Sequence, residues 1–229
     1  MQETLILGAN GSPLISQQTL ILFGCLVVAV ILHEISHGVA AFWFGDDTAK
    51  RAGRLTLNPI PHIDPFGSII LPAMGAIAGL PIFGYAKPVP VNASRMRHPR
   101  RDIVLVSLAG PACNLTLMAL AAIATRWLLN GGSGLASTFD GHNNNLLVEI
   151  VFYFALVNLL LGLFNLLPIP PLDGSAVLER FIPEQHLPTW YRVRPYGLLA
   201  IFVIVFWVPG VIDTILSPFY NALFDFVVK

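Results

Sequence analysis

Residues 19–44, TLILFGCLVVAVILHEISHGVAAFWF, form a long apolar run that is interrupted at positions 33–37 by His-Glu-Ile-Ser-His. A membrane-spanning helix needs about 20 mostly apolar residues, and this run is long enough. Ionisable side chains inside such a span cost about 2.5–3.5 kcal/mol each on insertion scales, so they need an interior partner or a function. The run therefore predicts a transmembrane helix that carries a functional site.

The composition of the whole chain agrees with a membrane location. Of its 229 residues, 55% are hydrophobic and 11% are charged, whereas a soluble domain typically contains about 25% charged residues. The 13 basic and 13 acidic residues give a formal net charge of zero, so no overall basic field suggests a nucleic-acid partner. The expected partner of most of the surface is the lipid bilayer.

Three further apolar runs are long enough to cross a bilayer, which gives four predicted transmembrane helices at about 19–44, 103–129, 146–167 and 196–218. Glycines and prolines interrupt residues 66–92, and this segment is predicted to be re-entrant or β-like, with backbone groups that an extended substrate could pair with. The first 18 residues have no basic n-region, so the first run is expected to remain as an anchor. The expected fold is an α-helical polytopic membrane protein in which residues 1–229 form a single membrane-embedded domain.

The distribution of basic residues predicts the orientation in the membrane. Residues 45–102 contain eight Lys or Arg and residues 168–195 contain three, whereas the loop at 130–145 contains none. By the positive-inside rule, the two basic stretches face the cytoplasm and the loop faces outside. Four spans then place both termini outside, and the two histidines lie toward the cytoplasmic end of the first span.

The histidine pair has the spacing of a metal site. His33 and His37 are separated by four residues, which places both imidazoles on one face of a helix. Zinc suits two imidazoles and a carboxylate, with a fourth position open for a water molecule whose pKa it lowers to about 7. Glu34 can accept the proton of that water. A chance match is the alternative, but three ionisable residues inside a span favour the metal site.

The main candidate for the third ligand is Asp173. It lies in NLLPIPPLDG, residues 165–174, directly after the predicted span at 146–167. The prolines end the helix, and Gly174 relaxes the backbone beside the carboxylate. Because Asp173 and the histidines lie at cytoplasmic ends of their spans, they can meet. An exposed aspartate in a proline-rich turn is the alternative.

Five stretches, in this order along the chain, carry a family likeness. They are HEISHG at 33–38, GRLTLNP at 53–59 with HIDP at 62–65, GYAKPVPVN at 84–92, SLAGP at 107–111 with Asn114, and LDG at 172–174. Together they resemble the site-2 protease family of intramembrane zinc metalloproteases, and the resemblance runs through most of the chain.

The resemblance implies one zinc ion per chain, bound by His33, His37 and Asp173, with Glu34 as the general base. It implies a transmembrane protein substrate that is cut near the cytoplasmic face, for regulated intramembrane proteolysis, by a multi-pass protein of a bacterial-type cell membrane. For Asn114 it suggests contact with the substrate or the developing oxyanion, and a helix–helix contact is the alternative. Larger members carry PDZ or CBS domains, which this sequence lacks, so regulation is expected to need a separate membrane partner.

Two other functions fit parts of the sequence. A membrane zinc peptidase with the same histidine pair could act on soluble or juxtamembrane peptides. An ion transporter could use the His/Asp cluster as part of an ion path. The carboxylate after a separate span favours the intramembrane protease over the first alternative, and a transporter would not need Glu34.

Overall fold

The computed structural model describes residues 16–64, 86–130, 145–197 and 210–229, with isolated positions 67, 70, 199, 201, 203 and 207. These residues form helices and irregular segments, without a strand among them. The helices are α1 (Gln17–Trp43), α2 (Thr48–Arg51), α4 (Pro99–Asn130), α5 (Leu146–Asn165), α6 (Ser175–Phe181), α7 (Leu187–Val193) and α9 (Val211–Val228). The 3-10 turns are η1 (Ile60–His62), η3 (Ala93–Arg95), η5 (Glu184–His186) and η6 (Arg194–Tyr196).

Helices α1, α4 and α5 are long and apolar enough to cross a membrane, and an 18-residue stretch of each has a mean hydropathy of 2.2, 1.9 and 2.4, respectively. They match the predicted spans at 19–44, 103–129 and 146–167. Local sequence explains where two of them begin. Ser16 and Asn145 precede α1 and α5, and their side-chain oxygens accept backbone N–H groups of the first turn.

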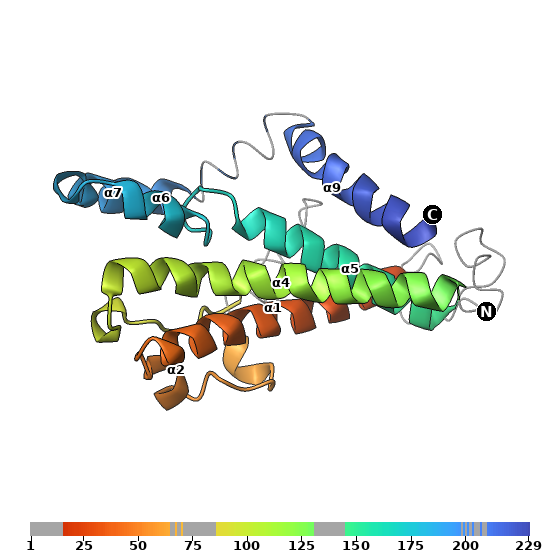
Figure 1. Ribbon diagram of the computed structural model, residues 1–229, viewed down its shortest axis with the longest axis horizontal. Helices are drawn as coiled ribbons and strands as arrows, with labels where there is room; N and C mark the ends of the chain where they lie inside the picture. Colours follow the sequence, from red (N-terminus) through yellow and green to blue (C-terminus); the bar gives the residue numbers. More distant parts are fainter. Residues whose placement is uncertain are drawn as a thin grey trace.

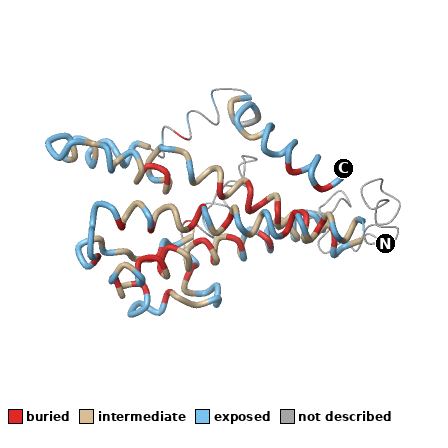
Figure 2. The backbone as a smooth tube through the Cα atoms, in the orientation of Figure 1, coloured by how far each residue is buried: buried red, intermediate tan, exposed pale blue. Residues whose placement is uncertain are grey.

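The three long helices lie side by side and form the bundle that contains the core (Figure 1). Small residues line their contacts, and Ala29, Ala41 and Ala155 are fully buried. Small side chains allow membrane helices to approach closely. Buried positions lie where the helices face one another (Figure 2), whereas large apolar residues such as Phe23 and Trp127 are exposed, as expected of surfaces that face lipid.

The predicted fourth span at 196–218 is not confirmed. Gly210 has a φ of 76°, in the left-handed region that favours glycine, and α9 begins only at Val211. Among the described residues, the apolar stretch of α9 is Thr214–Val228, which is shorter than a membrane span. The prediction of one span over residues 196–218 treated the residues before and after Gly210 as a single helix, because hydropathy carries no information on the direction of the backbone. Helix α9 packs against α4 and α5 through a cluster that contains Leu223 and Val227.

The predicted re-entrant or β-like segment at 66–92 lies mostly outside the described residues. Its described end, residues 86–92, is irregular and is not part of a strand. The β-like structure is therefore not confirmed in this part of the segment, and the re-entrant path of the remainder stays a prediction.

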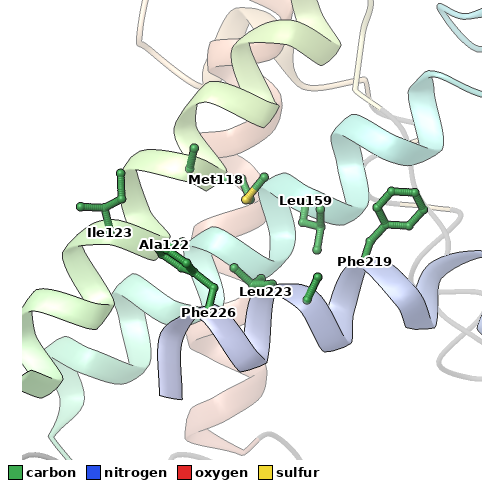
Figure 3. A pocket seen from close by; sticks show the side chains of 9 residues that line it. Met118, Ala122, Ile123, Leu159, Phe219, Leu223 and Phe226 are labelled. Carbon is green, nitrogen blue, oxygen red and sulfur yellow. The ribbon is translucent and has the colours of Figure 1, made fainter. Parts of the chain in front are cut away.

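A pocket of about 330 Å³ lies between α4, α5 and α9 (Figure 3). Its lining is apolar and includes Met118 and Ala122 from α4, Leu159 from α5 and Leu223 and Phe226 from α9. The lining contains no acid, base or imidazole, so this pocket offers no side chain for acid–base or metal chemistry.

Candidate metal centre

Three ligand atoms from two distant parts of the chain meet inside the bundle. Nε2 of His33 lies 3.0 Å from Nε2 of His37 and 3.1 Å from Oδ2 of Asp173, and the remaining separation, from His37 to Asp173, is 3.3 Å. In a tetrahedral zinc site with bonds of about 2.0–2.1 Å, neighbouring ligand atoms lie about 3.3 Å apart. The cluster has the separations of three ligands around one ion. Within the described parts of the chain, no other group of three or more His, Cys, Asp or Glu residues has such a geometry.

Helix α1 and the turn after α5 bring these ligands together. His33 and His37 are both buried, and they lie one turn apart on α1. Asp173 lies in the turn between α5 and α6, which folds back on the helix end because the Gly174 N–H donates to the Asn165 carbonyl oxygen at 2.7 Å. The sequence predicted that Asp173 and the two histidines can meet, and the structure brings them together.

Both imidazoles are turned so that Nε2 faces the cluster. Nδ1 of His37 lies 2.7 Å from the carbonyl oxygen of Val106, and Nδ1 of His33 lies 2.5 Å from Oδ1 of Asn114. These oxygens can only accept hydrogen bonds, so Nδ1 carries the proton in each neutral ring and Nε2 keeps a lone pair.

The resulting cluster needs a cation. Two Nε2 lone pairs and a carboxylate face one another, and the buried Oδ2 of Asp173 has no hydrogen-bond donor. Buried acceptors without a donor are costly, whereas a bound metal ion satisfies all three at once. Two imidazoles and one carboxylate form a ligand set that zinc takes in peptidases, with a fourth position left open. The residues therefore fit zinc.

Helix α4 approaches the cluster so closely that it has no room for a side chain at Gly110. A Cβ built there would lie 2.6 Å from Cε1 of His33 and 2.6 Å from Cε1 of His37, and its nearest atom would be Nε2 of His37. In the sequence, Gly110 stands out only as part of SLAGP. The available signal was a glycine within an apolar helix, which costs about 1 kcal/mol relative to alanine and needs a reason.

Glu34 lies beside the cluster and is held by the chain segment at residues 87–90. Its Oε2 accepts the Val89 N–H at 2.7 Å. The buried guanidinium of Arg54 donates to the carbonyl oxygens of Lys87 at 2.5 Å and Pro88 at 3.1 Å. This role of Arg54 was not predicted from the sequence, which does not show that its guanidinium is buried and must find acceptors.

The same segment has a further anchor on each side. The Lys87 N–H donates to the His62 carbonyl oxygen at 2.9 Å, and the Asn92 N–H donates to Oδ2 of Asp46 at 2.6 Å. Because proline has no N–H, residues 87–90 contain only two N–H groups, those of Lys87 and Val89, and both are engaged. This part of the segment therefore offers an extended substrate no N–H donor.

Asp46 is fully buried and is held ionised by local donors. Burial by itself raises the pKa of the Asp46 carboxyl, but the N–H groups of Asn92 and Thr48 and the Thr48 hydroxyl donate to it. These hydrogen bonds, with Arg95 nearby, outweigh the burial and place the pKa of Asp46 below its ordinary value.

Asn114 is fully buried on α4 and lies against a histidine. Its Oδ1 faces Nδ1 of His33, and its Nδ2 donates to Oδ1 of Asn158 at 2.8 Å. The structure thus brings Asn114 to the cluster, as expected, from the side opposite Nε2. Its suggested contact with the substrate or the oxyanion stays a prediction.

Comparison with known proteins agrees with this site. Residues 21–208 match the model of peptidase family M50. YwhC from Bacillus subtilis is 38% identical over 204 residues, which cover 89% of this chain and 87% of YwhC. Rip2 from Mycobacterium tuberculosis strain H37Rv is 35% identical over 179 residues, which cover 78% of this chain and 63% of Rip2. Both relatives are provisionally named zinc metalloproteases. No solved structure matches the chain significantly.

Fold, site and comparisons together define the class of protein as a membrane zinc peptidase. The chain belongs to peptidase family M50, the site-2 protease family, and the resemblance seen in the sequence is confirmed. It is an integral membrane protein and a zinc metalloprotease, with Zn²⁺ as its cofactor.

Proposed function

We propose that this chain is an intramembrane endopeptidase that binds one zinc ion through His33, His37 and Asp173 and cuts a transmembrane segment of another protein. The observation that carries the proposal is the triangle of three acceptor atoms, each 3.0–3.3 Å from the others. Two of them belong to α1, a helix of membrane-spanning length, and α4 closes over them at Gly110. A peptide bond that is cut here must enter the helical bundle.

The residues around the triangle support peptide hydrolysis. Zinc, when bound, supplies Lewis-acid chemistry, which polarises a carbonyl group and makes water a nucleophile near neutral pH. Glu34 accepts the proton of the attacking water and passes it to the leaving amine. The hydrogen bond from the Val89 N–H holds one oxygen of the Glu34 carboxylate in place during both transfers.

We propose that the metal site lies toward the cytoplasmic side of the membrane. His33 and His37 lie in the second half of α1, next to the basic stretch that follows it. At the other end of the bundle, Arg126 near the end of α4 donates to the Phe226 carbonyl oxygen of α9 at 2.5 Å. The end of α9 therefore lies beside the proposed outer end of α4, which supports an outside C-terminus.

We place this activity in a bacterial-type cell membrane. The chain acts as one membrane-embedded domain of a bacterial-type cell membrane, and cleavage near the cytoplasmic face serves regulated intramembrane proteolysis. A separate membrane partner supplies the regulation. The matches to bacterial relatives support the bacterial membrane in this proposal.

The test compares the parent protein with Glu34→Gln and with Glu149→Gln, which removes a different glutamate from α5. Zinc content is measured by elemental analysis, and cleavage is measured in proteoliposomes with a single-span substrate. We expect about one zinc per chain in all three proteins, and cleavage by the parent and Glu149→Gln only.

Two results would overturn the proposal. If the parent cuts a soluble peptide of the same sequence but not the membrane-embedded substrate, the substrate is not a transmembrane segment. If Glu34→Gln cleaves as fast as the parent, or if zinc crosses the liposome membrane independently of Glu34, the protein is not a peptidase of this kind.

A further inference from the structure

We propose that Asn158 of α5 is a positioning residue for the metal centre, which acts through Asn114 to hold His33 with Nε2 directed at the ion. The inference rests on the proposed function, since it assigns His33 as a ligand. It gives a role to a fully buried amide whose hydrogen bonds go to Asn114 and Phe154 and not to His33 or the ligand atoms.

A continuous chain of hydrogen bonds links three helices. Nδ2 of Asn158 donates to the Phe154 carbonyl oxygen, one turn earlier on α5, at 2.8 Å. Oδ1 of Asn158 accepts from Nδ2 of Asn114 at 2.8 Å, and the same Nδ2 lies 3.4 Å from the Ala29 carbonyl oxygen of α1. Oδ1 of Asn114 then faces Nδ1 of His33 at 2.5 Å. The four side-chain contacts form one relay from α5 through α4 to α1.

The direction of this relay is set by backbone groups. The carbonyl oxygens of Phe154 and Ala29 can only accept, so both amide nitrogens must point toward them. Each amide oxygen consequently points onward, from Asn158 to Asn114 and from Asn114 to His33. If the Asn114 amide were reversed, its oxygen would face the Ala29 carbonyl oxygen and Oδ1 of Asn158. Three acceptors would then lie together without a donor.

His33 depends on this relay, whereas His37 does not. Nδ1 of His37 donates to the backbone carbonyl of Val106, which side-chain replacement does not remove. For His33 the acceptor is a side-chain amide, whose orientation is fixed by Asn158 and Ala29. Without Oδ1 of Asn158, the Asn114 amide can turn over and present N–H groups to His33. The ring would then be protonated on Nε2 and could not bind the ion through that atom.

The experiment measures the zinc dissociation constant of detergent-purified protein by competition with a chromophoric chelator. Asn158→Leu keeps the approximate side-chain volume but cannot accept or donate, and we expect about tenfold weaker binding. Asn158→Ser can donate to Phe154, as Ser36 does to Leu32 at 2.7 Å, but it is too short to reach Asn114. It should weaken binding to a similar extent, and it tests the relay if the leucine variant does not fold.

Two variants separate positioning from packing. In Asn158→Asp, a protonated carboxyl can accept from Asn114 and donate to Phe154, so zinc binding should stay within about threefold of the parent. Thr125→Val removes an equally buried hydrogen bond from α4, the 2.8 Å contact to the Ala121 carbonyl oxygen, and should leave zinc binding unchanged. Nitrogen-15 NMR of labelled histidine should show Nδ1–H at His33 in the parent and lose that signature in Asn158→Leu.

The outcomes are distinguishable. The relay would be overturned if both Asn158→Leu and Asn158→Ser bound zinc as tightly as the parent. It would also be overturned if Thr125→Val and Asn158→Asp weakened zinc binding as much as Asn158→Leu does. If the parent and His33→Ala bind zinc equally well, the ligand assignment of the proposed function fails instead.

Discussion

Replacing Gly110 by alanine is expected to weaken zinc binding while favouring the helix that carries the substitution. Alanine is the better helix former by about 1 kcal/mol, so α4 itself gains from the change. The added methyl group, however, points at the two imidazoles. A substitution that ordinarily stabilises a helix should therefore disable the site.

The size of the effect follows from the contacts. Carbon atoms pack best at about 3.5–4.0 Å, and the new Cβ would lie 2.6 Å from Cε1 of both His33 and His37. The deficit of about 0.9 Å requires ring rotation or movement of α4. Either change disturbs the Nδ1 contacts, because Val106 and Asn114 lie four residues before and after Gly110 on the same helix. We expect zinc affinity to fall about 10–100-fold and turnover to fall about 100-fold.

The assay compares the parent, Gly110→Ala and Gly24→Ala for zinc dissociation constant, thermal unfolding and cleavage of a single-span substrate. Gly24 is also a helical glycine, but a Cβ there would meet nothing within 4 Å, so Gly24→Ala should bind zinc as the parent does. The reasoning would be refuted if Gly110→Ala bound zinc with parental affinity and cleaved at the parental rate.

Two further predictions concern the segment that holds Glu34. Arg54→Met should lower kcat about tenfold at unchanged zinc content, because the Lys87 and Pro88 carbonyls lose their donor and the Val89 N–H shifts from Glu34. Arg51→Met, which removes an exposed arginine paired with Asp47, is the control, and equal losses in both variants would contradict this role. The second prediction uses the lowered pKa of Asp46. A lowered folded-state pKa stabilises the protein above the unfolded value of about 3.9, and this stabilisation is lost as the pH falls through the folded-state pKa. With zinc chelated, Asp46→Asn should therefore melt at a lower temperature than the parent at pH 7, and this difference should shrink below about pH 4; a constant difference across that range would argue against the assignment.

Much of the bundle was predictable because the signals that define it are local. The predicted limits of the first three spans lie within four residues of α1, α4 and α5. Apolar length suffices for that result. The fourth predicted span is not confirmed, and the left-handed backbone at Gly210, just before α9 begins, is a property of conformation that hydropathy does not contain.

The metal ligands form an intermediate case. The spacing of His33 and His37 follows from helical geometry alone, so the sequence determined that pair. Asp173 is far away along the chain, and its selection relied on topology, on the proline-rich turn and on the family resemblance. The structure places its Oδ2 within 3.3 Å of both imidazoles, which no pattern of residues could have measured.

A membrane protein with a histidine pair suited to zinc can be recognised from the sequence, because hydrophobic length and helical period are properties of neighbouring residues. Three relations are visible only in the folded chain: Gly110 leaves room for the imidazoles, Asn158 is linked to His33 through Asn114, and Arg54 supports the segment that holds Glu34. These relations depend on distances between helices and loops far apart in the chain. Such distances are set by the packing of the whole bundle, which no local stretch of sequence specifies.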